Sequence, residues 1–289
     1  MFYLELLING LFAGSVYALF AVGLTMVYGV FRFINFAHGE LIAWGAYGVL
    51  LFRGAPFDLP LAAAVAPALG LVVALGLLQD RLVYQPLAQG DRVTLLVASI
   101  GLSFFLRNAL QLAFGAEVTT YGVSLGPGVE FGPLAVTAVQ LAMVAAALVF
   151  LGGLYLLLTR TALGKALRAV SDNPELAGVM GLPLGLVNIA VWALASLFAG
   201  VGGILLALDT NLEPVMGLAN LVKAFAAVLL GGAGNVWGAL IGGLFIGLAE
   251  NLSVAFIQPG YKDFVAFATI ALVLFFRPRG IFALAHGVR

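Results

Sequence analysis

Polar side chains set within long apolar stretches are the first candidates for chemistry, because placing them in an apolar environment is costly. Two groups of them lie beside predicted helix breaks, one early and one late in the chain. The candidate residues for a substrate path are Asn35, His38, Glu40, Gly231, Gly232 and Asn235. Discontinuous helices in both halves of a membrane chain indicate such a path. The alternative is that both breaks are ordinary cytoplasmic turns.

Signatures of enzymes and metal sites fail at specific positions. Lys165 follows Gly164, but a phosphate-binding loop needs a second glycine where Thr159 stands. His38 and His286 are far apart and have no metal-ligand spacing. The chain also contains no cysteine. The sequence therefore predicts no catalytic residue, no metal site and no cofactor bound by this chain.

Three charged residues lie inside predicted membrane-spanning stretches. Lys223 and Glu250 fall at similar depth in neighbouring stretches, so they are able to form an ion pair. Arg107 lies near the end of another stretch. Each has either a structural role, as an ion pair or as a long side chain that reaches the membrane surface, or a role in a transport path.

Composition assigns the chain to the polytopic membrane proteins. Of its 289 residues, 63% are hydrophobic and 9% are charged, against about 45–50% and about 25% in soluble domains. Residues 142–158 are apolar on every face, which excludes the alternating strands of a transmembrane β-barrel. The formal net charge is zero, which argues against nucleic acid as a partner.

The apolar stretches predict an all-α bundle of about nine membrane-spanning helices, or eight to ten if short segments are merged or split. They lie near 4–29, 38–52, 60–79, 93–113, 134–158, 186–208, 218–231, 238–256 and 262–276. The second and seventh adjoin the breaks, which predicts interrupted helices. Basic residues such as Arg32, Arg160 and Arg168 gather in alternate connections, which predicts an N-terminus outside and a C-terminus inside. The whole chain, 1–289, is predicted to be one transmembrane domain.

The longest predicted cytoplasmic connection, 159–184, contains a predicted short helix. Asn173 is suited to cap its start, Pro174 fits its first position, and Gly181 fits its end. Its apolar face, at positions i, i+3 and i+4, consists of Leu176, Val179 and Met180. Ala177 is expected on the opposite, polar side. The apolar face either packs on the protein's own spans or the lipid interface, or docks on a cytoplasmic partner.

Four motifs carry a resemblance to a known family. They are Asn-Phe-Ala-His-Gly-Glu at 35–40, Gly-Lys-Ala-Leu-Arg-Ala-Val at 164–170 with Asp172, Ala177, Gly178 and Gly181, Gly-Gly-Ala-Gly-Asn-Val-Trp-Gly-Ala at 231–239, and Arg-Pro-Arg-Gly at 277–280. In this order they resemble the permeases of ABC transporters for branched-chain amino acids. The size is similar to that of the shorter, LivH-type subunit of the pair, and the resemblance runs essentially end to end.

The resemblance implies a multi-pass permease subunit of the bacterial inner membrane, surrounded by lipid, that forms half of a translocation path for small hydrophobic amino acids. It implies a second related permease, two cytoplasmic ATPase subunits that bind ATP and Mg²⁺, and a periplasmic substrate-binding protein. ATP hydrolysis is then the work of the partners, and this chain is not an enzyme. The residues expected to couple to the ATPases are Gly164, Arg168, Asp172, Leu176, Gly178, Val179 and Met180.

Two other functions stay open at this stage. The family that the chain resembles also includes permeases for urea and short amides. A secondary transporter working alone is the other alternative, but an ion-coupled carrier should bury carboxylates near the membrane midplane. The acidic residues of this chain are expected at or near the membrane edges.

Several glycines are spaced four residues apart. The pairs are Gly10 and Gly14, Gly238 and Gly242, and Gly243 and Gly247. Small residues at this spacing let helices approach closely in lipid. We expect close packing within the chain, and the pairing surface with a second permease is the alternative.

Overall fold

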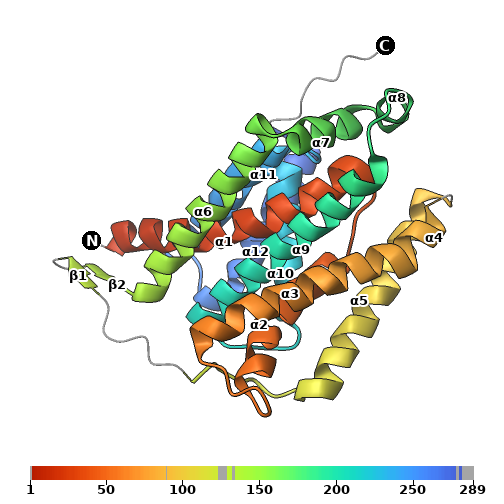
Figure 1. Cartoon of the computed structure of the whole chain (residues 1–289). Helices are drawn as coiled ribbons and strands as arrows, with labels where there is room; N and C mark the ends of the chain where they lie inside the picture. The colour runs from red at the N-terminus through yellow and green to blue at the C-terminus, as the bar shows by residue number, and fades with distance from the viewer. Residues whose placement is uncertain (1, 89, 123–128, 132–133, 278–279, 282–289) are drawn as a thin grey trace.

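The computed structural model describes residues 2–88, 90–122, 129–131, 134–277 and 280–281. The first half contains α1 (Phe2–Phe31), α2 (His38–Arg53), α3 (Leu61–Gln79), a π-helical turn (Asp80–Tyr84), α4 (Gln85–Leu87), α5 (Arg92–Phe114), and the antiparallel strands β1 (Val129–Phe131) and β2 (Leu134–Val136). The second half contains α6 (Ala138–Arg160), α7 (Ala162–Asp172), α8 (Pro174–Val179), α9 (Leu184–Asp209), α10 (Met216–Gly231), α11 (Val236–Ser253), a 3₁₀ turn (Pro259–Tyr261) and α12 (Lys262–Phe276). Figure 1 shows α7 and α8 at the end of the bundle far from the N-terminus.

The all-α membrane fold is confirmed, with a smaller number of candidate spans than predicted. Among the described residues, seven helices are long and apolar enough to cross a membrane, and α10 is a shorter apolar helix. The segment predicted at 38–52 folds as α2, which has 16 residues. Such a helix is about 24 Å long, whereas the hydrocarbon core of a bilayer is about 30 Å thick. The described residues therefore provide seven to eight candidate spans, which meets the predicted range of eight to ten only at its lower end.

One predicted span begins later than expected. The stretch predicted from 134 starts with β2, and α6 begins only at Ala138. Thr137 caps this helix, because its hydroxyl accepts a hydrogen bond from the backbone N–H of Gln140 while the Gln140 side chain accepts one from the backbone N–H of Thr137. This reciprocal capping satisfies amides that the first turn of a helix leaves without partners.

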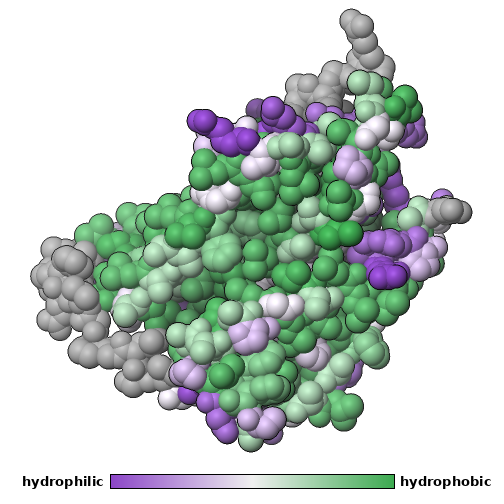
Figure 2. Space-filling view, viewed as in Figure 1, coloured by the Kyte–Doolittle hydropathy of each residue, from purple (hydrophilic) through white to green (hydrophobic). Residues whose placement is uncertain are grey.

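Five helices form the core of the molecule. α1, α2, α9, α10 and α11 pack against one another, while α5, α6 and α12 lie at the periphery. The most apolar window of α1 is 89% buried, whereas that of α12 is only 6% buried. Figure 2 shows one face covered mainly by hydrophobic residues, with hydrophilic residues gathered near its margins. Such a surface is suited to lipid on the outside of the bundle.

Glycines bring α1 and α11 into backbone contact. A Cβ atom on Gly10 would lie 2.9 Å from the Cα atom of Leu248, and one on Gly14 would lie 2.9 Å from the Cα atom of Leu244. A Cβ atom on Gly247 would overlap the backbone of Gly14. The expectation of close packing within the chain is confirmed for these positions.

Candidate functional site

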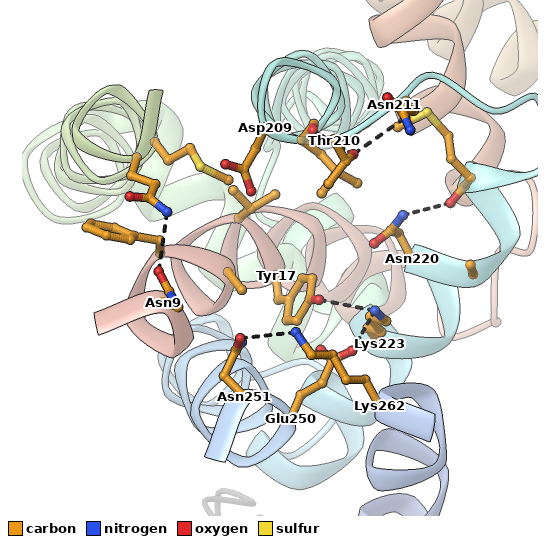
Figure 3. Close-up of a pocket in the computed structure, with 18 of the residues that line it drawn as sticks. Asn9, Tyr17, Asp209, Thr210, Asn211, Asn220, Lys223, Glu250, Asn251 and Lys262 are labelled. Carbon is orange, nitrogen blue, oxygen red and sulfur yellow. Dashed lines mark hydrogen bonds and ion pairs between the residues drawn. The ribbon is translucent and has the colours of Figure 1, made fainter. Parts of the chain in front are cut away.

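A polar cavity of about 550 Å³ lies among the ends of several helices (Figure 3). It is lined by the first half of α1, the start of α6, the end of α9, the start of α10, the end of α11 and the start of α12. Figure 3 shows Tyr17 at the centre of a ring of polar side chains from these helices. α1 and α11 run in opposite directions, and the cavity is lined by residues 9–17 near the start of α1 and by residues 250–251 near the end of α11. The cavity therefore lies at the end of the bundle that is opposite to α7 and α8.

An ion-pair cluster occupies one side of this cavity. The Nζ atom of Lys223 lies 2.7 Å from Glu250 Oε1 and 3.0 Å from Asp263 Oδ1, and it donates a hydrogen bond of 3.1 Å to the hydroxyl of Tyr17. The Lys223 and Glu250 side chains are 14% and 2% exposed. The predicted pairing of Lys223 with Glu250 is thus confirmed. Its four members come from four different helices, so the cluster holds α1, α10, α11 and α12 together at this end.

The sequence did not predict the rest of the cavity. Asn9, Asp209, Asn220 and Asn251 also line it. Each is a polar residue near a helix end that the charge pattern places on the same side as Lys223. Their shared position in the sequence pattern could have identified them as candidates. Only the packing of the helices shows that they face the same cavity.

The early group of predicted path residues lies at the break between α1 and α2. Asn35, His38 and Glu40 are all buried, and none of them lines the cavity. Asn35 Oδ1 accepts hydrogen bonds from the backbone N–H of Ala37 at 3.0 Å and from the hydroxyl of Tyr84 at 2.8 Å. The break is therefore enclosed by protein, which satisfies the condition for irregular backbone in a membrane.

Glu40 forms a second buried ion pair that links α2 to the peripheral helix α5. Its Oε1 atom lies 2.5 Å from Arg107 Nη2 and accepts a hydrogen bond of 2.9 Å from the hydroxyl of Ser103. Glu40 is 1% exposed and Arg107 is 13% exposed. Of the two roles considered for Arg107, this geometry supports the structural one, as the partner of Glu40 in an ion pair.

We expect Arg107→Ala to destabilise the protein by about 3 kcal/mol or more, because it leaves a buried carboxylate without its charge partner. The measurement is the thermal unfolding temperature of the purified protein in detergent. The double variant Glu40→Gln/Arg107→Gln, which removes both charges, should regain most of the lost stability. Equal unfolding temperatures for Arg107→Ala and the parent chain would contradict this account.

The late group of predicted path residues forms a tight connection between α10 and α11. A Cβ atom on Gly231 would overlap the backbone of Gly238, so the two helices touch through their backbones here. Gly232 has φ +93°, a conformation that L side chains rarely adopt. The side chain of Asn235 caps α11 by accepting hydrogen bonds of 3.1 Å from the backbone N–H groups of Trp237 and Gly238. The break thus has a complete local explanation as a helix-to-helix turn.

Asn235 also lines a second cavity, of about 320 Å³, at the α7 end of the bundle. Arg168, Ser171 and Asp172 of α7 line the same space. Arg32 Nη2 donates a hydrogen bond of 2.6 Å to the backbone oxygen of Ser171. The predicted coupling segment therefore contacts the early helix break and lines a cavity together with a residue of the late one.

The first part of the 159–184 connection folds as α7, a helix that the sequence interpretation did not include. A Cβ atom on Gly164 would overlap the backbone of Leu157 and Leu158, so glycine lets α7 fold back against the end of α6. Arg168 donates a hydrogen bond to the backbone oxygen of Leu158. Both residues fix the position of α7, while Asp172 is exposed at its C-terminal end.

The predicted short helix is present as α8, and its apolar face is open. Asn173 caps it by accepting a hydrogen bond of 3.0 Å from the backbone N–H of Leu176. Leu176, Val179 and Met180 are 58%, 85% and 75% exposed. The described part of the chain therefore leaves this face uncovered.

The expected position of Ala177 is wrong. It is 4% exposed and faces the protein, because α8 packs against α7 and α9 on that side. Gly178 is half-buried on the same side, where a Cβ atom would lie 3.3 Å from a methyl group of Leu184. The helix is thus attached through its small residues and presents its large apolar residues outward. Of the other sequence features, Pro278, Arg279 and His286 lie outside the described residues.

Comparisons with known proteins agree with this architecture. The family model described as branched-chain amino acid transport system / permease component matches residues 6–274. The permease protein BraD of the high-affinity branched-chain amino acid transport system of Pseudomonas aeruginosa is 35% identical over 96% of this chain and 95% of its own length. LivH of the corresponding Escherichia coli system is 33% identical over 97% of this chain and 96% of its own length.

More distant likenesses concern other transporters. The ribose import permease RbsC of Escherichia coli is 28% identical over 93% of this chain and 84% of its own length. The solved structure of PsaBC from Streptococcus pneumoniae in complex with a Fab has a TM-score of 0.52 at 14% identity, over 94% of this chain and 91% of that one, and this likeness shows the fold alone. The matches over nearly the full length establish that this chain belongs to the branched-chain amino acid ABC transporter permease family, as its non-catalytic, membrane-embedded component.

Proposed function

We propose that this chain forms half of the path through the bacterial inner membrane for branched-chain amino acids, in a complex with a second related permease. Two cytoplasmic ATPases that bind ATP and Mg²⁺ supply the energy, and a periplasmic binding protein delivers the substrate. The observation that carries this proposal is the separation of two surfaces: a polar cavity lies at one end of the bundle, and the uncovered apolar face of α8 lies at the other.

The proposed topology is N-terminus outside and C-terminus inside, with the chain working as one transmembrane domain. Nine segments then cross or enter the membrane, with α2 counted as a short one. Arg32, Arg160 and Arg168 all belong to the end of the bundle that carries α7 and α8, as the excess of basic residues on the cytoplasmic side requires. The cavity then faces the periplasm.

The two helix breaks are proposed to close the path below the cavity. His38 Nε2 lies 3.3 Å from the backbone oxygen of Phe20, about one helical turn along α1 from Tyr17, which lines the cavity. Gly234, in the other break, donates its backbone N–H to the hydroxyl of Thr25 at 2.9 Å. These contacts support a route along α1 that passes the residues Asn35, His38, Glu40, Gly231, Gly232 and Asn235.

The coupling surface is proposed to be the exposed face of α8, held in place by α7. Covering such side chains stabilises a complex by roughly 1.5–3 kcal/mol for each one that becomes fully buried. Gly164, Arg168 and Gly178 position the two helices, while Leu176, Val179 and Met180 contact the ATPase; Asp172, exposed at the end of α7, lies beside this surface.

The test of this topology uses the absence of native cysteine. We expect Ala116→Cys, which is exposed after α5, to react with a membrane-impermeant maleimide in spheroplasts. Val179→Cys, expressed without the ATPases, should react only in inverted membrane vesicles. The reverse pattern of labelling would contradict the proposed import direction, and equal labelling of one position from both sides would contradict a fixed topology.

A further inference from the structure

The charged groups of the large cavity differ in how fully they are paired. Lys223 has three N–H donors, and all three have partners in Glu250, Asp263 and Tyr17. Among the described residues, the Nζ atom of Lys262 donates only one hydrogen bond, of 3.3 Å, to Asn251 Oδ1. Lys262 therefore has donors to spare at the cavity.

Glu250 has the complementary deficit. Its Oε1 atom accepts from Lys223, but its Oε2 atom is buried and has no hydrogen-bond partner among the described residues. A buried acceptor without a donor costs free energy. A ligand that brings a donor to this carboxylate is favoured for the same reason.

The spare donor and the spare acceptor lie close together. Asn251 follows Glu250 on α11 and accepts the hydrogen bond from Lys262, so it connects the two. Figure 3 shows Lys262 and Glu250 next to each other on one side of the cavity. An α-amino acid carries its carboxylate and its ammonium on a single carbon atom, so it matches a lysine and a glutamate placed side by side.

The cavity also has apolar lining residues, which we call the apolar wall: Phe12, Ala13, Val16, Met143, Leu206 and Met216. Polar residues such as Asn9, Gln140 and Asn220 complete the lining. The cavity volume of about 550 Å³ lies within the usual range for small-molecule sites. A branched aliphatic side chain is suited to the apolar wall. A ligand that lacks its carboxylate leaves the spare donors of Lys262 unused, and one that lacks its ammonium group leaves the Oε2 atom of Glu250 without a donor.

We infer that this cavity is a substrate-binding site in which Lys262 binds the carboxylate of the amino acid, Glu250 binds its ammonium group, and the apolar wall holds its side chain. The inference rests on the proposed import direction, since it places the site on the periplasmic side. It assigns selection for the zwitterion to this chain, in addition to any selection by the binding protein.

The experiment measures protection of a cysteine placed in the cavity. Ala219 lines the cavity one turn from Lys223 and is exposed. In washed spheroplasts that contain the permease with its ATPases, a polar maleimide should label Ala219→Cys. Leucine at ten times its dissociation constant should slow labelling about tenfold, because roughly a tenth of the sites then stay free. Neither 4-methylpentanoate nor 3-methylbutan-1-amine, at the same concentration, should protect.

Variants at Lys262 test whether this residue binds the carboxylate of leucine. Lys262→Gln in the Ala219→Cys background should raise the leucine concentration for half-protection about tenfold or more, as the loss of one charge-assisted hydrogen bond does. Lys262→Arg should restore most of the affinity. Glu5→Gln is the control, because Glu5 is exposed on α1 and does not line the cavity. Glu250→Gln serves as a second variant, read only where gel filtration shows a folded complex.

The outcomes separate the inference from the proposed function. Labelling of Ala219→Cys without protection by leucine overturns the inference and leaves the import direction intact. Equal protection by leucine and by 4-methylpentanoate overturns the role of Glu250 in binding the ammonium group. Labelling of Ala219→Cys only from the cytoplasmic side, with Ala116→Cys behaving in the same way, overturns the proposed direction itself.

Discussion

Replacing Val179 or Met180 with aspartate should reduce substrate-stimulated ATP hydrolysis by about tenfold or more, since a charge at the centre of an apolar contact costs on the order of 2 kcal/mol. Both side chains are largely exposed in this chain, so the permease itself should fold normally. The measurements are co-purification of the ATPases with the permease and ATP hydrolysis by the complete transporter in lipid.

The control must avoid Ala177, which is buried against α7 and α9. Ala162→Asp is a better control, because Ala162 is exposed at the start of α7, where a negative charge is favourable at a helix N-terminus. It adds the same charge to the same connection but lies away from the α8 face. Normal assembly and stimulated hydrolysis in both the Val179→Asp and Met180→Asp variants would show that the α8 face does not bind the ATPases.

Gly247→Leu should prevent most of the permease from reaching its folded state. Any side chain at this position meets the backbone of Gly14 on α1, and backbone cannot move aside as a flexible side chain does. Overpacking costs about 1–3 kcal/mol, and more where the neighbour is backbone that cannot shift, and it also removes the close helix contact that drives association in lipid. The measurements are the yield of monodisperse protein in detergent and its unfolding temperature.

Gly101→Leu is the matched control for this substitution. Gly101 lies on the peripheral helix α5, is exposed, and has no heavy atom within 4 Å of the position that a Cβ atom would occupy. The same change of residue should therefore be tolerated there. If Gly247→Leu gave as much folded protein as Gly101→Leu, the α1–α11 contact could not have the importance that we assign to it.

The sequence predicted those features that depend on local properties. The apolar stretches gave the helical membrane class and the approximate bounds of most helices, because length and composition decide whether a segment can span a bilayer. Asn173 and Pro174 predicted the start of α8, since capping involves only neighbouring backbone groups. The Lys223–Glu250 pair was predictable because both residues are charged and lie at similar depth in neighbouring helices.

The other features of the fold and of the candidate site depend on contacts between segments that are distant in the sequence. Glu40 pairs with Arg107 across 67 positions of the chain, and no local pattern connects the two. Ala177 faces inward although its neighbours suggested the opposite, because the packing of α8 on α7 and α9 selects the buried side. The polar cavity exists only where the first half of α1 meets the ends of five other helices. Helix formation depends on the local sequence. Which side chains face a common cavity depends on how the helices pack, and this packing is a property of the whole tertiary structure.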